Sequence, residues 1–217
     1  MKKYAILFAM KQEAQSLIEE LDAQLIENDY FEIYQKENIY IAISKVGIIN
    51  ASSCFAYVNQ KFNIDLFINA GLVGTFSNEL QPLQPVVVKN SYLGNADATG
   101  FGYTLGQVPG MPSFYSSEKE LLESFKEFEQ VDICSSDVFI NSNEKVDKII
   151  NPISETIKIF DMECFGFFQS AYIFKKPIIS LKIISDHIDN GSNEEQFNLI
   201  LSQGSLKISE ILLEHLK

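Results

Sequence analysis

Arginine and tryptophan are absent from this chain of 217 residues, and all 17 of its basic residues are lysines. Arginine is the usual bidentate partner of phosphate and carboxylate groups, whereas lysine replaces it only as a point charge. The absence therefore disfavours a substrate or nucleophile that is itself a phosphate, although lysines and backbone amides also bind phosphate. The formal net charge of −12 argues against a nucleic acid partner and against an anionic membrane surface.

Cysteines, histidines and long apolar runs are scarce as well. Cys54, Cys134 and Cys164 are widely spaced in apolar surroundings, which predicts reduced core thiols and neither a disulfide nor a metal site. No apolar run reaches the ~18 residues of a membrane-spanning helix. The apolar stretch 4–10 leads into charged residues without a cleavage site, so it is not expected to be a signal peptide. We expect a cytoplasmic protein that needs no cofactor.

Apolar, β-rich runs alternate with amphipathic helical patterns along the chain. Strands are predicted at 4–9, 39–44, 66–69, 86–88 and 178–184, and helical patterns cover 13–21, 118–128 and 197–216. Continuous apolar strands between amphipathic helices indicate a sheet that is covered on both faces, hence an α/β fold. No linker, repeat or low-complexity segment divides the chain, so residues 1–217 are expected to form a single domain.

Polar or glycine-containing stretches follow three of the predicted strands. They are residues 10–13, the stretch "NAGLVG" (69–74) and residues 185–186. Ligands of α/β sheets bind outside the carboxyl ends of the strands, which makes Asp186 a candidate acid or base. On the residues alone, a turn or helix-capping aspartate is the more common case. His187 follows on the opposite face of an extended chain and is expected to be structural.

Five segments in a fixed order carry a more specific signal. They read "AMKQEAQSL" (9–17), "FINAGLVG" (67–74), "NADATGFGYTLGQVPGMP" (95–112), "FDMECFGF" (160–167) and "IISDHID" (183–189). The series resembles the 5′-methylthioadenosine/S-adenosylhomocysteine nucleosidases of the nucleoside phosphorylase superfamily, nearly end to end. Its least common motif is close to the family's D-x-T-x-F-G-Y-x-x-G-Q-x-P-G. The resemblance implies a three-layer α/β/α fold around a central mixed, twisted β-sheet.

The reaction that this resemblance implies is hydrolysis of the N-glycosidic bond of 5′-substituted adenosines, such as 5′-methylthioadenosine, S-adenosylhomocysteine and 5′-deoxyadenosine. Adenine leaves readily only when its N7 is protonated, so a carboxylic acid kept protonated by burial is required. A second carboxylate must activate water on the opposite side of the sugar. Asp186 matches the family's acid, with Ser185 to position it, and Glu13 matches the base. Without the resemblance, Glu13 would be an ordinary first-turn glutamate.

The resemblance also assigns residues around the substrate. Glu163 matches the glutamate that accepts hydrogen bonds from the ribose hydroxyls, and Met162 matches the residue that packs under the sugar. Phe139 matches the aromatic that stacks on adenine, while the backbone of Ile140 would meet the base edge. Met10 and Val46 match positions in the pocket wall. Phe101 and Pro109 match residues that a neighbouring subunit contributes to the 5′ pocket. The implied assembly is a homodimer with a shared pocket.

Some positions depart from the family pattern. Leu72 replaces a small polar residue near the water, Lys182 replaces an arginine, and Asp161 replaces a glutamate. Lys45 and Ile48 stand where a glycine and a lysine are common. These changes leave the acid, the base and the sugar clamp in place, but they leave open the position of the water, the rate and the 5′ group.

Three alternatives follow from these departures. The first two are an aminodeoxyfutalosine-type nucleosidase and a nucleoside phosphorylase that uses phosphate in place of water. The third is a catalytically silent nucleoside-binding relative, and the departures at Leu72 and Lys182 are the evidence for it. The missing arginines and the presence of Glu13 count against phosphorolysis, and the joint retention of Asp186, Glu13 and Glu163 counts against silence.

Overall fold

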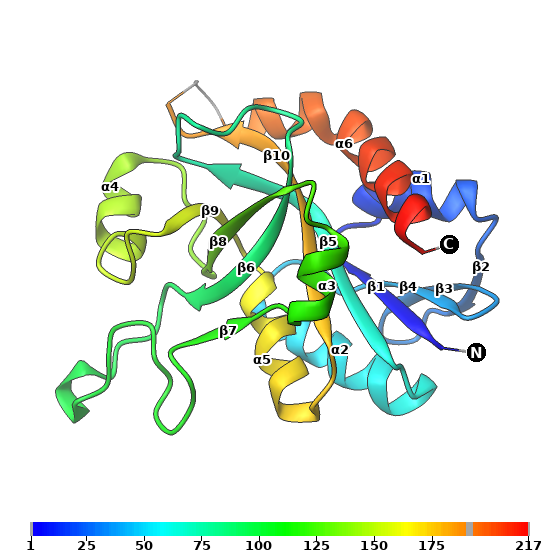
Figure 1. Ribbon diagram of the computed structural model, residues 1–217, viewed down its shortest axis with the longest axis horizontal. Helices are drawn as coiled ribbons and strands as arrows, with labels where there is room; N and C mark the ends of the chain where they lie inside the picture. Colours follow the sequence, from blue (N-terminus) through cyan, green and yellow to red (C-terminus); the bar gives the residue numbers. More distant parts are fainter. Residues whose placement is uncertain (1, 190–192, 217) are drawn as a thin grey trace.

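The computed structural model describes residues 2–189 and 193–216, which form a twisted mixed sheet with helices on both faces (Figure 1). The strands are β1 (Tyr4–Phe8), β2 (Gln24–Glu27), β3 (Glu32–Lys36), β4 (Ile39–Ile43), β5 (Leu66–Thr75), β6 (Pro85–Leu93), β7 (Phe114–Ser116), β8 (Glu129–Ser135), β9 (Ile157–Asp161) and β10 (Ile178–His187). The helices are α1 (Lys11–Glu20), α2 (Ile48–Phe62), α3 (Lys119–Ser124), α4 (Asn143–Lys145), α5 (Cys164–Phe174) and α6 (Asn193–His215), with helical turns at Thr99–Phe101 and Val146–Ile150.

The sheet is organised around β5. Its first half pairs in parallel with β1 on one side and β10 on the other, and β4 continues the parallel set beyond β1. From β10 the sheet turns through β6, β8 and β9, and β9 pairs in antiparallel fashion with Gly74 and Thr75 at the far end of β5. The mixed, twisted sheet that the resemblance implied is thus confirmed. The carboxyl ends of β1, β4, β5 and β10 meet at one edge.

Helices cover the two faces of the sheet because its central strands are apolar on both sides. On one face, α2 and α5 pack against the sheet with residues such as Phe55 and Phe168. On the other face, α1 and α6 pack with Leu17 and Ile208 (Figure 1). Strands β5 and β10 are buried along their whole length, as expected for strands between two helical layers. The predicted three-layer α/β/α architecture is confirmed.

Two strands are longer than the sequence predicted, and this changes where the polar stretches lie. β5 runs to Thr75 and β10 to His187, so Gly71, Gly74 and Asp186 lie within strands and not after them. The pairing of the two strands continues to the last residues of each, across an irregularity between Ile184 and Asp186. The glycines and the carboxylate predict the ends of these strands, but ladder hydrogen bonds to neighbouring strands keep the chain extended beyond them.

The predicted helix 118–128 is shorter in the structure. Only Lys119–Ser124 is helical, and the chain then turns at Phe125 and Phe128 before it enters β8. The apolar residues of this stretch are still buried as their spacing predicts, since Phe125 packs in the core against α6. However, Phe125 lies in a turn and not in a helix.

The three cysteines are buried, as predicted, and burial raises the pKa of each thiol to about 12. Across residues 2–189 and 193–216, no helix is long and apolar enough to span a membrane.

Candidate active site

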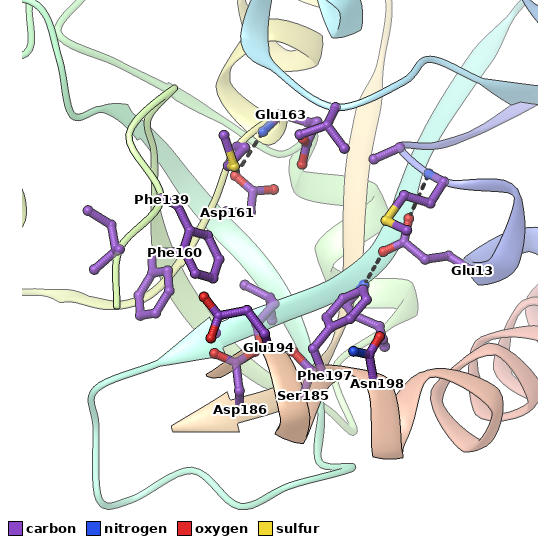
Figure 2. Close-up of a pocket in the computed structure, with 18 residues that line it drawn as sticks. Glu13, Phe139, Phe160, Asp161, Glu163, Ser185, Asp186, Glu194, Phe197 and Asn198 are labelled. Atoms are coloured by element: carbon purple, nitrogen blue, oxygen red, sulfur yellow. Dashed lines mark hydrogen bonds between the residues drawn. The ribbon is translucent and has the colours of Figure 1, made fainter. Parts of the chain in front are cut away.

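A cavity of about 370 Å³ lies at the edge where the parallel strands end (Figure 2). The structure brings nine of the predicted site residues together around it, and they are Met10, Glu13, Val46, Phe139, Ile140, Met162, Glu163, Ser185 and Asp186. In Figure 2 the two proposed proton-transfer groups lie apart, with Asp186 on the left and Glu13 on the right. Glu163 lies above them. His187 lies outside this cavity, in line with its alternate place on the strand.

Glu13 is held in place by two backbone amides. It is the third residue of α1, and its side chain turns back so that Oε2 accepts from Met10 N–H (3.0 Å) while Oε1 accepts from Leu72 N–H (2.8 Å). A β-carbon at Gly71 would lie only 2.9 Å from Glu13 Oε1, so glycine is required there. The glutamate is therefore both a helix cap and a carboxylate fixed against β5.

The pKa of Glu13 is raised, chiefly because burial disfavours the charged form. The amides of Leu72 and Met10 and the charge of Lys182 oppose this effect, whereas the charge of Asp161 adds to it. A buried carboxyl with a raised pKa and fixed orientation is suited to take a proton from water.

Asp186 lies at the irregularity of β10. Its neighbour Ser185 bonds to Asp186 Oδ1 through Oγ and also lies 3.2 Å from the carbonyl oxygen of Val73. A β-carbon at Gly74 would lie 2.9 Å from Asp186 Oδ2 and 2.4 Å from Cε2 of Phe160. Gly74 thus lets the carboxyl group and the Phe160 ring approach the strand, as Gly71 does for Glu13.

Ser185 can serve either protonation state of Asp186. A hydroxyl has one proton, so it donates either to the carboxylate of Asp186 or to the carbonyl of Val73. When it donates to Val73, its lone pairs are free to accept a hydrogen bond from a protonated Asp186. The carboxyl group therefore keeps a partner whether or not it carries a proton.

Glu163 is the residue that precedes α5, and it is buried. Its Oε1 accepts a hydrogen bond from Gly47 N–H at 2.9 Å. This bond links the segment after β9 to the residue that precedes α2. Burial first, and then the charge of Asp161, raise the pKa of Glu163 to about 8, while Gly47 N–H and Lys182 oppose them. Met162, beside it, also lines the cavity.

One departure from the family pattern, Leu72, is accommodated locally, and two others lie outside the cavity. Leu72 contributes to the site through its backbone N–H, which any residue supplies, while its side chain packs against Gly204 of α6. A β-carbon at Gly204 would lie 2.5 Å from Cδ2 of Leu72, so the larger side chain relies on this glycine. Lys45 and Ile48 do not line the cavity.

Several lining residues were missed from the sequence. Phe160 lies beside Phe139 in Figure 2, and Glu194, Phe197 and Asn198 enter the cavity from the first turns of α6. Phe160 is the last residue but one of β9, a strand that was not predicted because its sequence is short and half-polar. The α6 residues follow from topology alone, because a helix that begins after β10 must start at the carboxyl edge of the sheet.

Phe101 and Pro109 do not line the cavity of their own chain. They lie in residues 95–112, a loop between β6 and β7 that extends away from the sheet (Figure 1). The Phe101 side chain is 87% exposed, more than any other large apolar residue described.

Comparisons with known proteins agree with this geometry. Residues 3–217 match the family model of the phosphorylase superfamily. The 5′-methylthioadenosine/S-adenosylhomocysteine nucleosidase of Staphylococcus epidermidis is 32% identical over 183 residues, which is 80% of this chain and 79% of the relative. This chain belongs to that nucleosidase family. The resemblance seen in the sequence is confirmed.

Two further members of the family cover the whole chain. The enzyme of the same name from Staphylococcus carnosus is 28% identical over 98% of both chains. The crystal structure of the Neisseria meningitidis nucleosidase, in complex with methylthio-immucillin-A, superimposes with a TM-score of 0.92 at 26% identity. It covers 100% of this chain and 99% of that one, so the family fold is present from end to end.

Proposed function

We propose that this protein hydrolyses the N-glycosidic bond of 5′-substituted adenosines, such as 5′-methylthioadenosine and S-adenosylhomocysteine, and releases adenine and the 5′-substituted ribose. The observation that carries the proposal is the convergence of Asp186, Glu13 and Glu163 on one cavity. The names of the related enzymes support the same reaction.

On the adenine side, Asp186 acts as the general acid. It donates a proton to N7, so that adenine departs as a neutral base and not as an anion. Ser185 then donates to the carboxylate that remains. Phe139, with Phe160 beside it, supplies an aromatic surface for the base, and the backbone of Ile140 reads the base edge.

On the sugar side, Glu13 acts as the general base. As the glycosidic bond lengthens, positive charge develops on the ribose, and the acidic surroundings of Glu13 and Glu163 stabilise it. Glu163 accepts hydrogen bonds from the ribose hydroxyls, and Met162 packs under the ring. Met10 and Val46 form the wall towards the 5′ group, where Phe197 adds a further aromatic face.

Phosphate should have no effect on this reaction. We expect 5′-methylthioadenosine to yield adenine and free methylthioribose at the same rate with and without inorganic phosphate, because Glu13 occupies the place where an anion would have to bind. Adenine release followed by absorbance or chromatography, with the sugar product identified by mass spectrometry, checks this. A ribose 1-phosphate product would establish the phosphorylase alternative, and binding without any adenine release would establish the silent one.

The proposed assembly is a homodimer in which Phe101 and Pro109 of each subunit complete the 5′ pocket of the other. An exposed phenylalanine on a projecting loop is unfavourable in water, and other apolar side chains near the cavity, Val46 and Phe139, are also more than one third exposed. The proposed cytoplasmic location remains a prediction.

Phe101→Glu should convert the dimer into a monomer and lower kcat/KM for 5′-methylthioadenosine, because a charge cannot enter an apolar pocket. Light scattering and the adenine-release assay measure the two effects. Tyr30→Glu is the matched control, since Tyr30 is 68% exposed but lies between β2 and β3, and it should change neither quantity. A monomeric wild-type protein with full activity would refute the shared pocket.

A further inference from the structure

Lys182 is a buried cation directly behind the cavity. Its side chain is 3% exposed, and among the described residues it is the only lysine buried to this extent. It lies on β10 in register with Gly71 of β5, where an added β-carbon would lie 2.9 Å from Glu13 Oε1. Lys182 does not line the cavity, so the substrate would not touch it.

The ammonium group of Lys182 binds Asp161, with Nζ 2.9 Å from Oδ2. Asp161 is tied in further, because its Oδ1 accepts from Ser135 Oγ at 2.6 Å and from Glu163 N–H at 3.3 Å. The N–H of Cys164 also points at this carboxylate, at 3.1 Å from Oδ2. Asp161 therefore caps the start of α5 and fixes the backbone of the sugar-binding residue Glu163.

The charge balance of this region is unusual. Glu13, Asp161 and Glu163 all line one cavity; Lys182 pairs with Asp161, and its charge acts on the other two. Burial alone would lower the pKa of Lys182, but Asp161 first, and then Cys164 and Glu163, raise it above its usual value. Asp186 on β10 and Glu194 on α6 also line this cavity, and Asp137 lies beside Gly47, whose N–H binds Glu163.

We propose that Lys182 is a positioning residue for the hydrolysis: its ion pair holds Asp161, and through Asp161 the backbone of the sugar-binding residue Glu163, while its charge acts on the carboxyl groups of Glu13 and Glu163. The inference rests on the proposed function. Without the lysine, the carboxyl groups would hold their protons to higher pH, and a protonated Glu13 cannot accept a proton from water. Lys182 and Asp161 both depart from the family pattern, which has an arginine and a glutamate at these positions, and in this chain the two form an ion pair with each other.

The sign of the pH effect follows from the direction of the shifts. Lys182 lowers the pKa of Glu13 and of Glu163, so its loss raises both further above the ordinary value of a glutamate. Activity that needs the ionised forms is then lost at neutral pH and returns as the pH rises. A role in folding alone would lower the rate equally at every pH and leave the profile unshifted.

The test compares Lys182→Met with the double variant Lys182→Met, Asp161→Asn. We expect the acidic limb of kcat/KM for adenine release to move up by about one pH unit in Lys182→Met, which is about a tenfold loss on that limb. In the double variant the limb should move up by less, because the charge of Asp161, now removed, itself raises the pKa of Glu13. The double variant removes the unpaired carboxylate, while the asparagine oxygen can still accept from Ser135. A wild-type profile in the double variant would show that the lysine only neutralises Asp161 and would overturn the proposal.

A second readout does not depend on catalysis. The side-chain carboxyls of Glu13 and Glu163 can be titrated by NMR with ¹³C-labelled glutamate, and both midpoints should rise in Lys182→Met, with that of Glu13 still raised in the double variant. Unmoved midpoints in a folded variant would contradict the inference. If wild-type protein releases no adenine while the midpoints do shift, the proposed function fails and the electrostatic role stands. Should Lys182→Met not fold, the double variant decides.

Lys158→Met is the matched control. Lys158 lies on β9 and also forms ion pairs, with Glu79 and Glu129. These partners are surface groups that do not line the cavity. Its removal should shift neither the rate profile nor the glutamate midpoints. A shift of the same size in this control would mean that any lost lysine has the effect, and it would refute a specific role for Lys182.

Discussion

Asp186→Asn should lower kcat/KM for adenine release by about 10²–10⁴, the usual contribution of a general acid. The amide has nearly the same size as the carboxyl group and can keep a hydrogen bond with Ser185, so the fold and the cavity should be retained. What it cannot do is deliver a proton to N7 of adenine. The loss should therefore appear in kcat, with substrate binding little changed.

The control for this variant is Asp189→Asn, three residues further along the same segment. Asp189 bonds to Asn143 and lies outside the cavity, so its neutralisation should leave adenine release unchanged. Circular dichroism and thermal unfolding establish that both variants fold. Near-normal turnover in folded Asp186→Asn would remove Asp186 from the acid role and would direct attention to Glu194, which points into the same part of the cavity (Figure 2).

The parts of the fold that could be predicted from sequence are those in which local pattern and burial agree. Strands β1 and β4 and helix α1 were predicted to within about two residues. Strand β9 was not predicted, because its alternation of isoleucine with lysine and phenylalanine is too short to distinguish from a loop. Its place between β8 and β5 is decided by partners far away in the sequence, which a local window does not contain.

The candidate site divides in the same way. Glu13, Glu163 and Asp186 could be predicted as site residues, because the residues next to them in the sequence are characteristic of the family. The requirement for Gly71 and Gly74 could not be derived, since it depends on side chains that arrive from α1, β9 and β10. Lys182 was seen as a departure, but its pairing with Asp161 needed the register of β10.

Glu13→Gln should reduce kcat by about 10²–10⁴, on the same grounds as for the acid, because a glutamine does not accept a proton from water. Binding of the transition-state analogue methylthio-immucillin-A should persist, since the groups proposed to hold the base and the ribose are untouched. Adenine release and calorimetric titration of the analogue measure the two quantities. Glu20→Gln, at the exposed end of the same helix, is the control and should change neither.

The same substitution also tests the structural part played by Glu13. Its two oxygens accept from Met10 N–H and Leu72 N–H, whereas a glutamine has one acceptor oxygen and must turn its NH₂ group toward one of these donors. Leaving one buried donor unpaired costs about 1–3 kcal/mol of stability. Glu13→Gln should therefore melt at a lower temperature than Asp186→Asn, whose serine partner can reverse its hydrogen bond. Equal melting temperatures would mean that the N-terminus of α1 does not depend on this carboxylate, and that Glu13 is held for the reaction alone.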